Sequence, residues 1–219
     1  MKTFDIAIDG PSGAGKSTVA RLLAEKLGIL YLDTGALYRA VGLKAMRCGW
    51  SENDEEVAKQ LKSTDISVKT VGGEQRVYLD GEDVSRAIRE NRVSDYGSRF
   101  SALPSVRAVL LGVQRRIAAE RSTVLDGRDI GTCVLPDAEY KFYLTASVET
   151  RAKRRYDELT ARGEEVSFER VKADIEERDE RDMTRAIAPL KKAEDAIEIN
   201  SDDMTAEQVA ERMLGYIVK

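Results

Sequence analysis

Short apolar runs alternate with longer amphipathic stretches along most of the chain. Runs of four or five mostly apolar residues predict buried strands, which we place at residues 4–8, 29–32, 123–126, 140–144 and 196–199. Apolar residues spaced three and four apart predict helices, which we place at residues 16–27, 35–47, 105–120, 149–161, 168–186 and 205–217. This alternation indicates an α/β fold whose parallel sheet carries helices on both faces.

Residues 63–103 interrupt the alternation. Two strand-like runs at 66–70 and 76–79 flank a glycine-containing turn at 71–75, so we expect a small antiparallel insert domain. The alternative is a hairpin without a function of its own, because surface insertions are well tolerated.

The first predicted strand leads directly into GPSGAGKST at residues 10–18. This is the spacing of a phosphate-binding loop, in which the glycines let the main chain curl around phosphate oxygens, Lys16 adds a cation and Ser17 is a Mg²⁺ ligand. The alternative is a plain glycine-rich turn, which the order of strand, loop and helix disfavours. The segment predicts a P-loop NTPase fold that binds a nucleoside triphosphate through Gly10, Pro11, Ser12, Gly13, Ala14, Gly15, Lys16, Ser17 and Thr18.

Two further strands end in segments with charged residues. After the second strand, Asp33 or Thr34 can cap a helix that carries Arg39 one turn inside it; the alternative is a capped helix with a surface arginine. After the run at 123–126, Asp126 stands where a strand-end acid holds Mg²⁺ through water. Arg128 and Asp129 follow at the end of the sheet where ligands collect. An exposed ion pair in a local turn is the alternative there.

The helix predicted at 168–186 changes character along one face. Val171 and Ile175 continue, by steps of three and four, into Arg178, Asp182 and Arg185. Charged groups on an inward face need partners, and a bound anion would be one. The alternative is an intrahelical network of salt bridges among Glu176, Glu177, Asp179 and their neighbours.

The preceding helix carries Arg151 and Arg155 four residues apart, and a polar link containing Gly163 follows it. This pattern predicts a mobile, cationic lid that excludes water from the reaction. A solvated helical face is the alternative.

The amino-acid composition limits the classes of function that the chain can have. The 219 residues suffice for one domain with a full core. The net charge of −4 argues against a nucleic-acid binder that relies on a basic surface. The chain has no histidine, which excludes a Ser-His-Asp triad, and Cys48 and Cys133 have no metal-ligand spacing. Because no apolar run could span a membrane and no signal segment is recognised, we expect a cytoplasmic protein.

Together the segments resemble the bacterial cytidylate kinases, a family of nucleoside monophosphate kinases that phosphorylate CMP and dCMP. The resemblance covers nearly the whole chain and is carried by GPSGAGKST at 10–18, LDTGALYRA at 32–40, LPSVR at 103–107, LDGRDIGTCVLPDA at 125–138 and ERDERDMTRAIAPL at 177–190. It implies transfer of the γ-phosphoryl group of ATP, with Mg²⁺, to CMP or dCMP in pyrimidine nucleotide metabolism. We expect a monomer whose partners are ATP, CMP and dCMP, without nucleic acid or membrane.

The resemblance also implies one kinase domain with three parts. These are a core (1–62, 104–150 and 187–219), a monophosphate-binding insert (63–103) and a helical lid (151–186).

By position in the family's motifs, Arg39, Arg128 and Arg185 are expected at the acceptor phosphate, and Arg178 and Asp182 at the sugar. Thr34 also borders the acceptor, and Ser98, Arg107 and Asp129 are expected at the base. We expect catalysis by Lys16, Arg39, Arg128, Arg155 and Arg185, ATP binding by the loop with Arg151 and Arg155, and Mg²⁺ binding by Ser17 and, through water, Asp126.

Asp129 would accept a hydrogen bond from the cytosine amino group, whereas the O4 atom of uracil would face the same carboxylate and be repelled. Two alternatives stay open: a kinase for another acceptor (UMP, AMP or a small metabolite), and an ATP-binding regulator that is not a kinase.

Overall fold

The computed structural model describes residues 4–217. The chain divides into two compact units. We call Met1–Leu30 with Ser122–Lys219 the P-loop unit, and Tyr31–Arg121 the middle unit.

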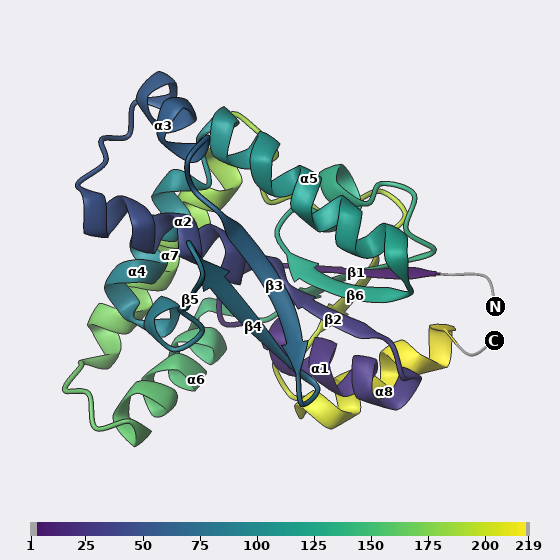
Figure 1. Cartoon of the computed structure of the whole chain (residues 1–219). Helices are drawn as coiled ribbons and strands as arrows, with labels where there is room; N and C mark the ends of the chain where they lie inside the picture. Colours follow the sequence, from purple (N-terminus) through teal and green to yellow (C-terminus); the bar gives the residue numbers. More distant parts are fainter. Residues whose placement is uncertain (1–3, 218–219) are drawn as a thin grey trace. The chain divides into compact units, whose positions relative to one another are not determined.

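A parallel sheet forms the centre of the P-loop unit (Figure 1). Its strand order is β2-β6-β1-β7-β8, and β1 pairs in parallel with both β6 and β7. Four of the five residues of β1 are buried, as expected for a strand covered on both faces. The strands are β1 (Asp5–Asp9), β6 (Thr123–Gly127), β7 (Tyr140–Thr145), β8 (Ile197–Asn200) and β2 (Leu30–Asp33), of which only Leu30 belongs to the P-loop unit.

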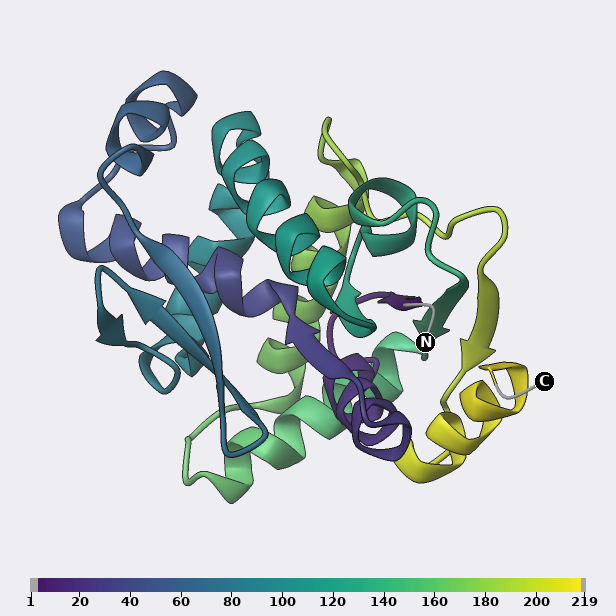
Figure 2. The same ribbon diagram turned by 45° about the vertical axis from the view of Figure 1, so that its right-hand side comes forward.

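The helices of this unit form two packed pairs. Helices α1 and α8 lie side by side, in purple and yellow in both views (Figures 1 and 2). Helices α6 and α7 share a separate apolar cluster of Ala152, Leu159, Val171 and Ile175. The elements are α1 (Lys16–Leu27), α6 (Val148–Ala161), α7 (Phe168–Thr184), α8 (Ala206–Ile217) and a π-helical turn, η2 (Ile130–Val134).

The middle unit has its own hydrophobic core, built from its helices and a small antiparallel sheet of order β3-β4-β5. Helices α2 and α4 cross closely, since a Cβ atom placed on Gly42 would lie 2.5 Å from the main-chain nitrogen of Gly97. The elements are α2 (Thr34–Cys48), α3 (Asp54–Leu61), β3 (Ile66–Val71), β4 (Glu74–Leu79), β5 (Glu82–Asp83), η1 (Ala87–Arg89, a 3₁₀ turn), α4 (Asn91–Phe100) and α5 (Pro104–Glu120).

The predicted α/β class, the parallel sheet and the antiparallel insert strands are confirmed. Thr205 and Gln208 form the reciprocal main-chain bonds of a capping box at the start of α8. Two helices, α3 and α4, were not predicted, and Arg185 lies just beyond the end of α7 rather than within it. The predicted boundaries of insert and lid stay predictions. Among residues 4–217, no helix is both long and apolar enough to cross a membrane.

Candidate active site

The phosphate-binding loop joins β1 to α1, as predicted. Gly10 has φ 149°, and a Cβ atom there would lie 1.9 Å from the carbonyl oxygen of Leu144 on β7. Only glycine fits this approach of the loop to the sheet. Gly15 caps α1 in a left-handed conformation, so the N-terminus of the helix directs its main-chain N–H groups toward the loop.

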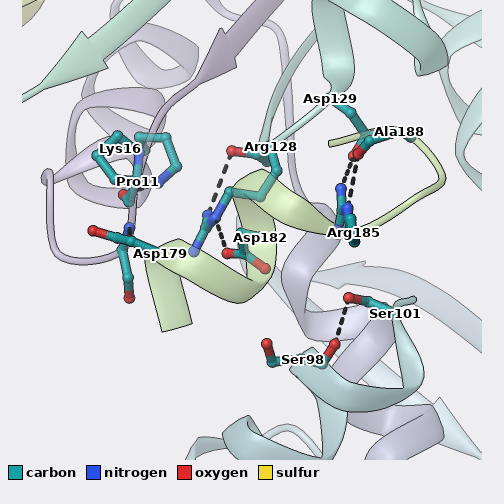
Figure 3. A network of polar contacts seen from close by, with 12 residues as sticks. Pro11, Lys16, Ser98, Ser101, Arg128, Asp129, Asp179, Asp182, Arg185 and Ala188 are labelled. Atoms are coloured by element: carbon teal, nitrogen blue, oxygen red, sulfur yellow. Dashed lines mark hydrogen bonds and ion pairs between the residues drawn. The ribbon is translucent and has the colours of Figure 1, made fainter. Parts of the chain in front are cut away.

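Lys16 is buried, and its Nζ donates a 2.7 Å hydrogen bond to the carbonyl oxygen of Pro11 (Figure 3). Burial lowers the pKa of Lys16 to about 7, and the cations Arg128 and Arg178 act in the same direction, while Asp126 opposes them. An anionic phosphate in this loop would reverse much of that cost, since an opposite charge favours the ammonium form.

Ser17 and Asp126 provide oxygen atoms suited to a hard cation. The Ser17 hydroxyl donates a 2.8 Å hydrogen bond to Oδ2 of Asp126, which is buried at the end of β6. Mg²⁺ prefers hydroxyl, carboxylate, phosphate and water oxygens, so this donor set fits the ion.

Asp9, at the end of β1, was not predicted as a site residue. Its two carboxylate oxygens each accept a 2.8 Å hydrogen bond, one from the main-chain nitrogen of Ile130 and one from that of Gly131. Burial raises the pKa of Asp9 to about 6, although the two hydrogen bonds and Lys16 oppose the shift. Asp9 thereby fastens the start of η2, directly after Arg128 and Asp129.

Arg128 pairs with Asp182 across two elements (Figure 3). Its Nε donates to Oδ2 of Asp182 at 2.8 Å, and Nη1 reaches the carbonyl oxygen of Gly127 at 3.4 Å. Burial raises the pKa of Asp182, but Arg128, Arg178 and Arg185 outweigh it and the net shift is downward. The alternative of an intrahelical network therefore does not account for Asp182, because this carboxylate is compensated by Arg128 from the segment after β6.

Arg185 makes the second such pair. Its Nη2 lies 3.1 Å from Oδ1 of Asp129, and its Nε donates to the carbonyl oxygen of Ala188 at 2.7 Å (Figure 3). Both members of the ion pair are almost fully buried. Ala188 has φ 47°, a left-handed conformation that is unusual for a residue with a Cβ atom. The turn after α7 thus holds the Arg185 guanidinium against Asp129.

The two predicted lid arginines have different surroundings. Arg155 forms a 2.7 Å ion pair with Glu158 on the same helix and is partly exposed. Arg151 is buried and pairs with Asp179 of α7, while its Nη1 donates to the carbonyl oxygen of Ser12 at 2.9 Å. Arg151 therefore contacts the phosphate-binding loop itself.

The middle unit contains four of the predicted acceptor residues. Asp33, rather than Thr34, caps α2: its Oδ1 accepts from the main-chain nitrogen of Ala36 at 3.0 Å, and its Oδ2 pairs with Nη2 of Arg39 at 2.7 Å. Burial raises the pKa of Asp33, but Arg39 outweighs it and the net shift is downward. The side-chain amide of Gln75, on β4, exchanges two hydrogen bonds with the main chain of Asp33, at 2.7 and 3.2 Å.

Three of the predicted acceptor-binding residues bury polar side-chain atoms within the middle unit. Among the described residues, the buried Oγ of Ser98 and the buried Nε of Arg39 make no hydrogen bond. Arg107 is buried, donates to the carbonyl oxygen of Ser101 at 3.3 Å and lies over the ring of Tyr38. A buried polar atom without a partner is uncommon in native proteins, so Ser98 and Arg39 have capacity for a polar ligand.

Sequence reasoning did not assign site roles to Asp9, Gln75 and Asp179. Asp9 ends an apolar strand just as Asp126 does, so the same signal was present. Gln75 and Asp179 are recognised only by contacts with residues far along the chain, at Asp33 and Ser12, and no local pattern marks them.

The P-loop, its strand-end acid and the arginine-aspartate pairs define the class of protein as a P-loop phosphotransferase. Comparisons with known proteins make this specific. The profile of the cytidylate kinase family matches residues 6–219, and the chain therefore belongs to this family.

Individual relatives support this assignment, and one solved structure shares the fold. The cytidylate kinase of Caldicellulosiruptor saccharolyticus is 50% identical, covering 100% of this chain and 97% of the relative. That of Caldanaerobacter subterraneus subsp. tengcongensis is 51% identical, with coverage of 99% and 96%. The shikimate kinase of Bacteroides thetaiotaomicron superimposes with a TM-score of 0.52 over 100% of both chains, but at 12% identity this likeness concerns the fold alone.

Proposed function

We infer that this chain transfers the γ-phosphoryl group of ATP to CMP or dCMP, giving ADP and CDP or dCDP. The observation that carries the inference is that the P-loop unit of a cytidylate kinase family member holds Arg128 and Arg185 in pairs with Asp182 and Asp129, in addition to the P-loop lysine. A protein that only binds ATP has no need of these further cations, whereas transfer between two phosphates does.

ATP is proposed to bind to residues 10–18, with its β- and γ-phosphates at Lys16. Arg155 is proposed as a further ATP-binding residue. Support comes from the loop geometry and from the buried Lys16, whose ammonium form a phosphate would favour. Ser17 and Asp126 would hold Mg²⁺, which when bound neutralises charge on the triphosphate.

The roles at the acceptor that the family's motifs imply are retained as proposals. Arg39, Arg128 and Arg185 would contact its phosphate, and Arg178 and Asp182 its sugar. Ser98, Arg107 and Asp129 are proposed at the base, and Thr34 is proposed to border the acceptor. Support for Arg39 and Ser98 comes from their buried polar atoms, which make no hydrogen bond among the described residues.

The proposed reaction needs positioning more than proton transfer. A phosphate oxygen of CMP attacks the γ-phosphorus of ATP in line, and Lys16 with the arginines neutralises charge on the transferring group. No general base is required, because the acceptor phosphate is already largely dianionic at neutral pH. The acids that pair with the arginines keep these side chains in defined positions before either nucleotide binds.

ADP production by the purified full-length chain tests the function, with CMP, dCMP, UMP, AMP or no acceptor. We expect CMP and dCMP to stimulate turnover well above UMP and AMP. The Lys16→Ala variant should lose at least about a hundredfold in kcat because it removes a preorganised cation, while its circular dichroism spectrum stays that of the wild type. Turnover without stimulation by any acceptor would indicate a regulator, and a clear preference for UMP or AMP would refute the proposed base recognition.

We also propose a cytoplasmic monomer that acts on free nucleotides without a nucleic-acid partner, in which residues 63–103 form the monophosphate-binding insert and 151–186 the lid. The net charge of −4 supports the absence of a nucleic-acid partner. Light scattering coupled to gel filtration would test the monomer, and a dimer mass would contradict it.

A further inference from the structure

Arg151 of α6 and Asp179 of α7 form a buried ion pair beside the phosphate-binding loop. The two helices are held together by the apolar cluster of Ala152, Leu159, Val171 and Ile175. The ion pair therefore joins two helices that are already packed against each other. Its geometry is therefore set by the helices rather than by the loop.

Both members of the pair bind the main chain of one loop residue, Ser12. Nη1 of Arg151 donates to the Ser12 carbonyl oxygen at 2.9 Å, and Oδ1 of Asp179 accepts from the Ser12 nitrogen at 3.2 Å. Nε of Arg151 is bound to the carbonyl oxygen of Ala146 at 3.0 Å, which fixes the plane of the guanidinium. The two hydrogen-bonding groups of a single loop residue are thus both held by the pair.

The loop is also seated closely on Arg151. A Cβ atom on Gly13 would lie 3.1 Å from Cβ of Arg151 and 3.3 Å from its carbonyl oxygen. Ser12 and Gly13 therefore rest against α6, and a shift of the pair would displace the loop that surrounds Lys16.

Electrostatics alone do not explain a carboxylate at this position. A negative charge near a triphosphate-binding loop disfavours the ligand, and a buried ion pair contributes little net stability compared with apolar residues of the same size. What the pair supplies is geometry: one donor and one acceptor, on two helices, for the two polar groups of Ser12.

We propose that Arg151 and Asp179 are positioning residues that hold Ser12, and with it the phosphate-binding loop, in the conformation that receives the triphosphate. The inference rests on the proposed function for the identity of the ligand. It gives Arg151 a role through the loop, and it adds Asp179 to the residues on which phosphoryl transfer depends.

The direction in which one substitution changes the affinity for ATP tests the proposal. In Asp179→Asn, the amide has one oxygen and cannot accept from both Arg151 and the Ser12 nitrogen, so Ser12 loses part of its support. We expect ATP binding, measured by calorimetry without acceptor, to weaken by about tenfold, the effect of losing one charged hydrogen bond. If only charge mattered, removal of a carboxylate would instead strengthen ATP binding, so stronger or unchanged binding would overturn the proposal.

A matched control and a second variant separate this effect from a loss of folding. Asp174→Asn lies on the same helix, removes an exposed pair with Arg170 and should leave ATP binding unchanged. The double substitution Arg151→Met with Asp179→Leu removes both charges of the pair and leaves neither one unpaired, so its thermal midpoint should stay close to that of the wild type. Its ATP affinity should nevertheless remain reduced by about tenfold, since neither side chain can hold Ser12; wild-type affinity would refute the positioning role.

Kinetics of the same variants keep the proposal distinct from the proposed function. We expect the KM for ATP to rise in Asp179→Asn, with the KM for CMP within about twofold of the wild type because the acceptor phosphate contacts are intact. If the wild-type chain proved inactive on CMP, the proposed function would fail while the ATP-binding experiment would still decide the role of the pair.

Discussion

The three arginines proposed at the acceptor phosphate each form an ion pair with an aspartate that restrains them. Arg39 pairs with Asp33, Arg128 with Asp182, and Arg185 with Asp129. A long cationic side chain loses much conformational freedom when it binds a phosphate, and a carboxylate partner that already orders it reduces that loss. Asp129 is proposed to have a second role, because its carboxylate would also accept from the amino group of cytosine.

Substitution of Asp129 by asparagine should change the choice of base. The amide of Asp129→Asn can donate to the O4 atom of uracil, which the carboxylate repels, and it can still accept from cytosine after rotation. We expect the ratio of kcat/KM for CMP to that for UMP to fall by about ten- to a hundredfold, the range for one buried polar contact. Rates with both acceptors would be measured on the same preparation.

The ratio is informative because a general loss of activity, for example through Arg185, affects both acceptors and cancels. The control is Asp137→Asn, at an exposed acid eight residues after Asp129 in the sequence, and it should leave the ratio unchanged. An unchanged ratio in Asp129→Asn would remove this residue from base recognition.

Among the elements, the crossing of α2 and α4 places Arg39 and Ser98 in the same core. A Cβ atom on Gly97 would lie 3.0 Å from Cα of Arg39 and 3.1 Å from its Cγ, so the helices touch at the residue proposed to bind the acceptor phosphate. In Gly97→Ala the added methyl group must push Arg39 away by a few tenths of an ångström. We expect the KM for CMP to rise by about tenfold, since small displacements of binding groups have large effects, with little change in the KM for ATP.

Gly112→Ala on α5 is the matched control, because a Cβ atom there meets nothing within 4 Å. Alanine is preferred over glycine in a helix by about 0.5–1 kcal/mol, so this variant should melt at a slightly higher temperature with unchanged kinetics. If Gly97→Ala behaved in the same way as Gly112→Ala, the close crossing would have no part in acceptor binding.

The elements that sequence patterns predicted well are those with strong local signals. The strands of the parallel sheet are mostly apolar runs, and α1, α2 and α8 have clear capping residues. Helix α4 was missed because a hydrophilic segment within a region of strand-like runs offers few apolar residues, with Val93 and Phe100 as its buried anchors. Likewise, the phosphate-binding loop could be predicted because its residues are consecutive, whereas the pairing of Asp182 with Arg128 requires the tertiary fold.

For the molecule as a whole, carboxylates link folding to pH. The chain has 35 lysine and arginine residues against 39 aspartate and glutamate residues, so acid leaves a large excess of positive charge. The pKa values of Asp33 and Asp182 are lowered in the folded state, where arginines outweigh the effect of burial. Asp9 acts in the opposite sense, since burial raises its pKa to about 6 and its contribution to stability falls as the pH rises above 4. Acid stability is thus a balance of several buried groups.

Asp202 offers a clean test of this linkage in the unfolding of the whole chain. Its Oδ1 accepts from the main-chain nitrogen of Ser147 at 2.8 Å and from the Ser147 hydroxyl at 2.9 Å, at the residue that caps α6. These hydrogen bonds, first that from the Ser147 main chain, lower the pKa of Asp202 from 3.8 to about 2. A lowered pKa means that the stabilisation is complete above pH 4 and is lost as the pH falls toward 2.

We therefore expect Asp202→Asn to unfold at a lower urea concentration than the wild type at pH 7 and pH 5, because an amide accepts the two hydrogen bonds less strongly than a carboxylate. The difference between the two midpoints should shrink at pH 4 and again at pH 3, as the wild-type carboxylate takes up a proton. Asp203→Asn, at an exposed neighbouring acid, is the control and should follow the wild type throughout. A difference that stayed constant from pH 7 to pH 3 would show that the charge of Asp202 does not stabilise the start of α6.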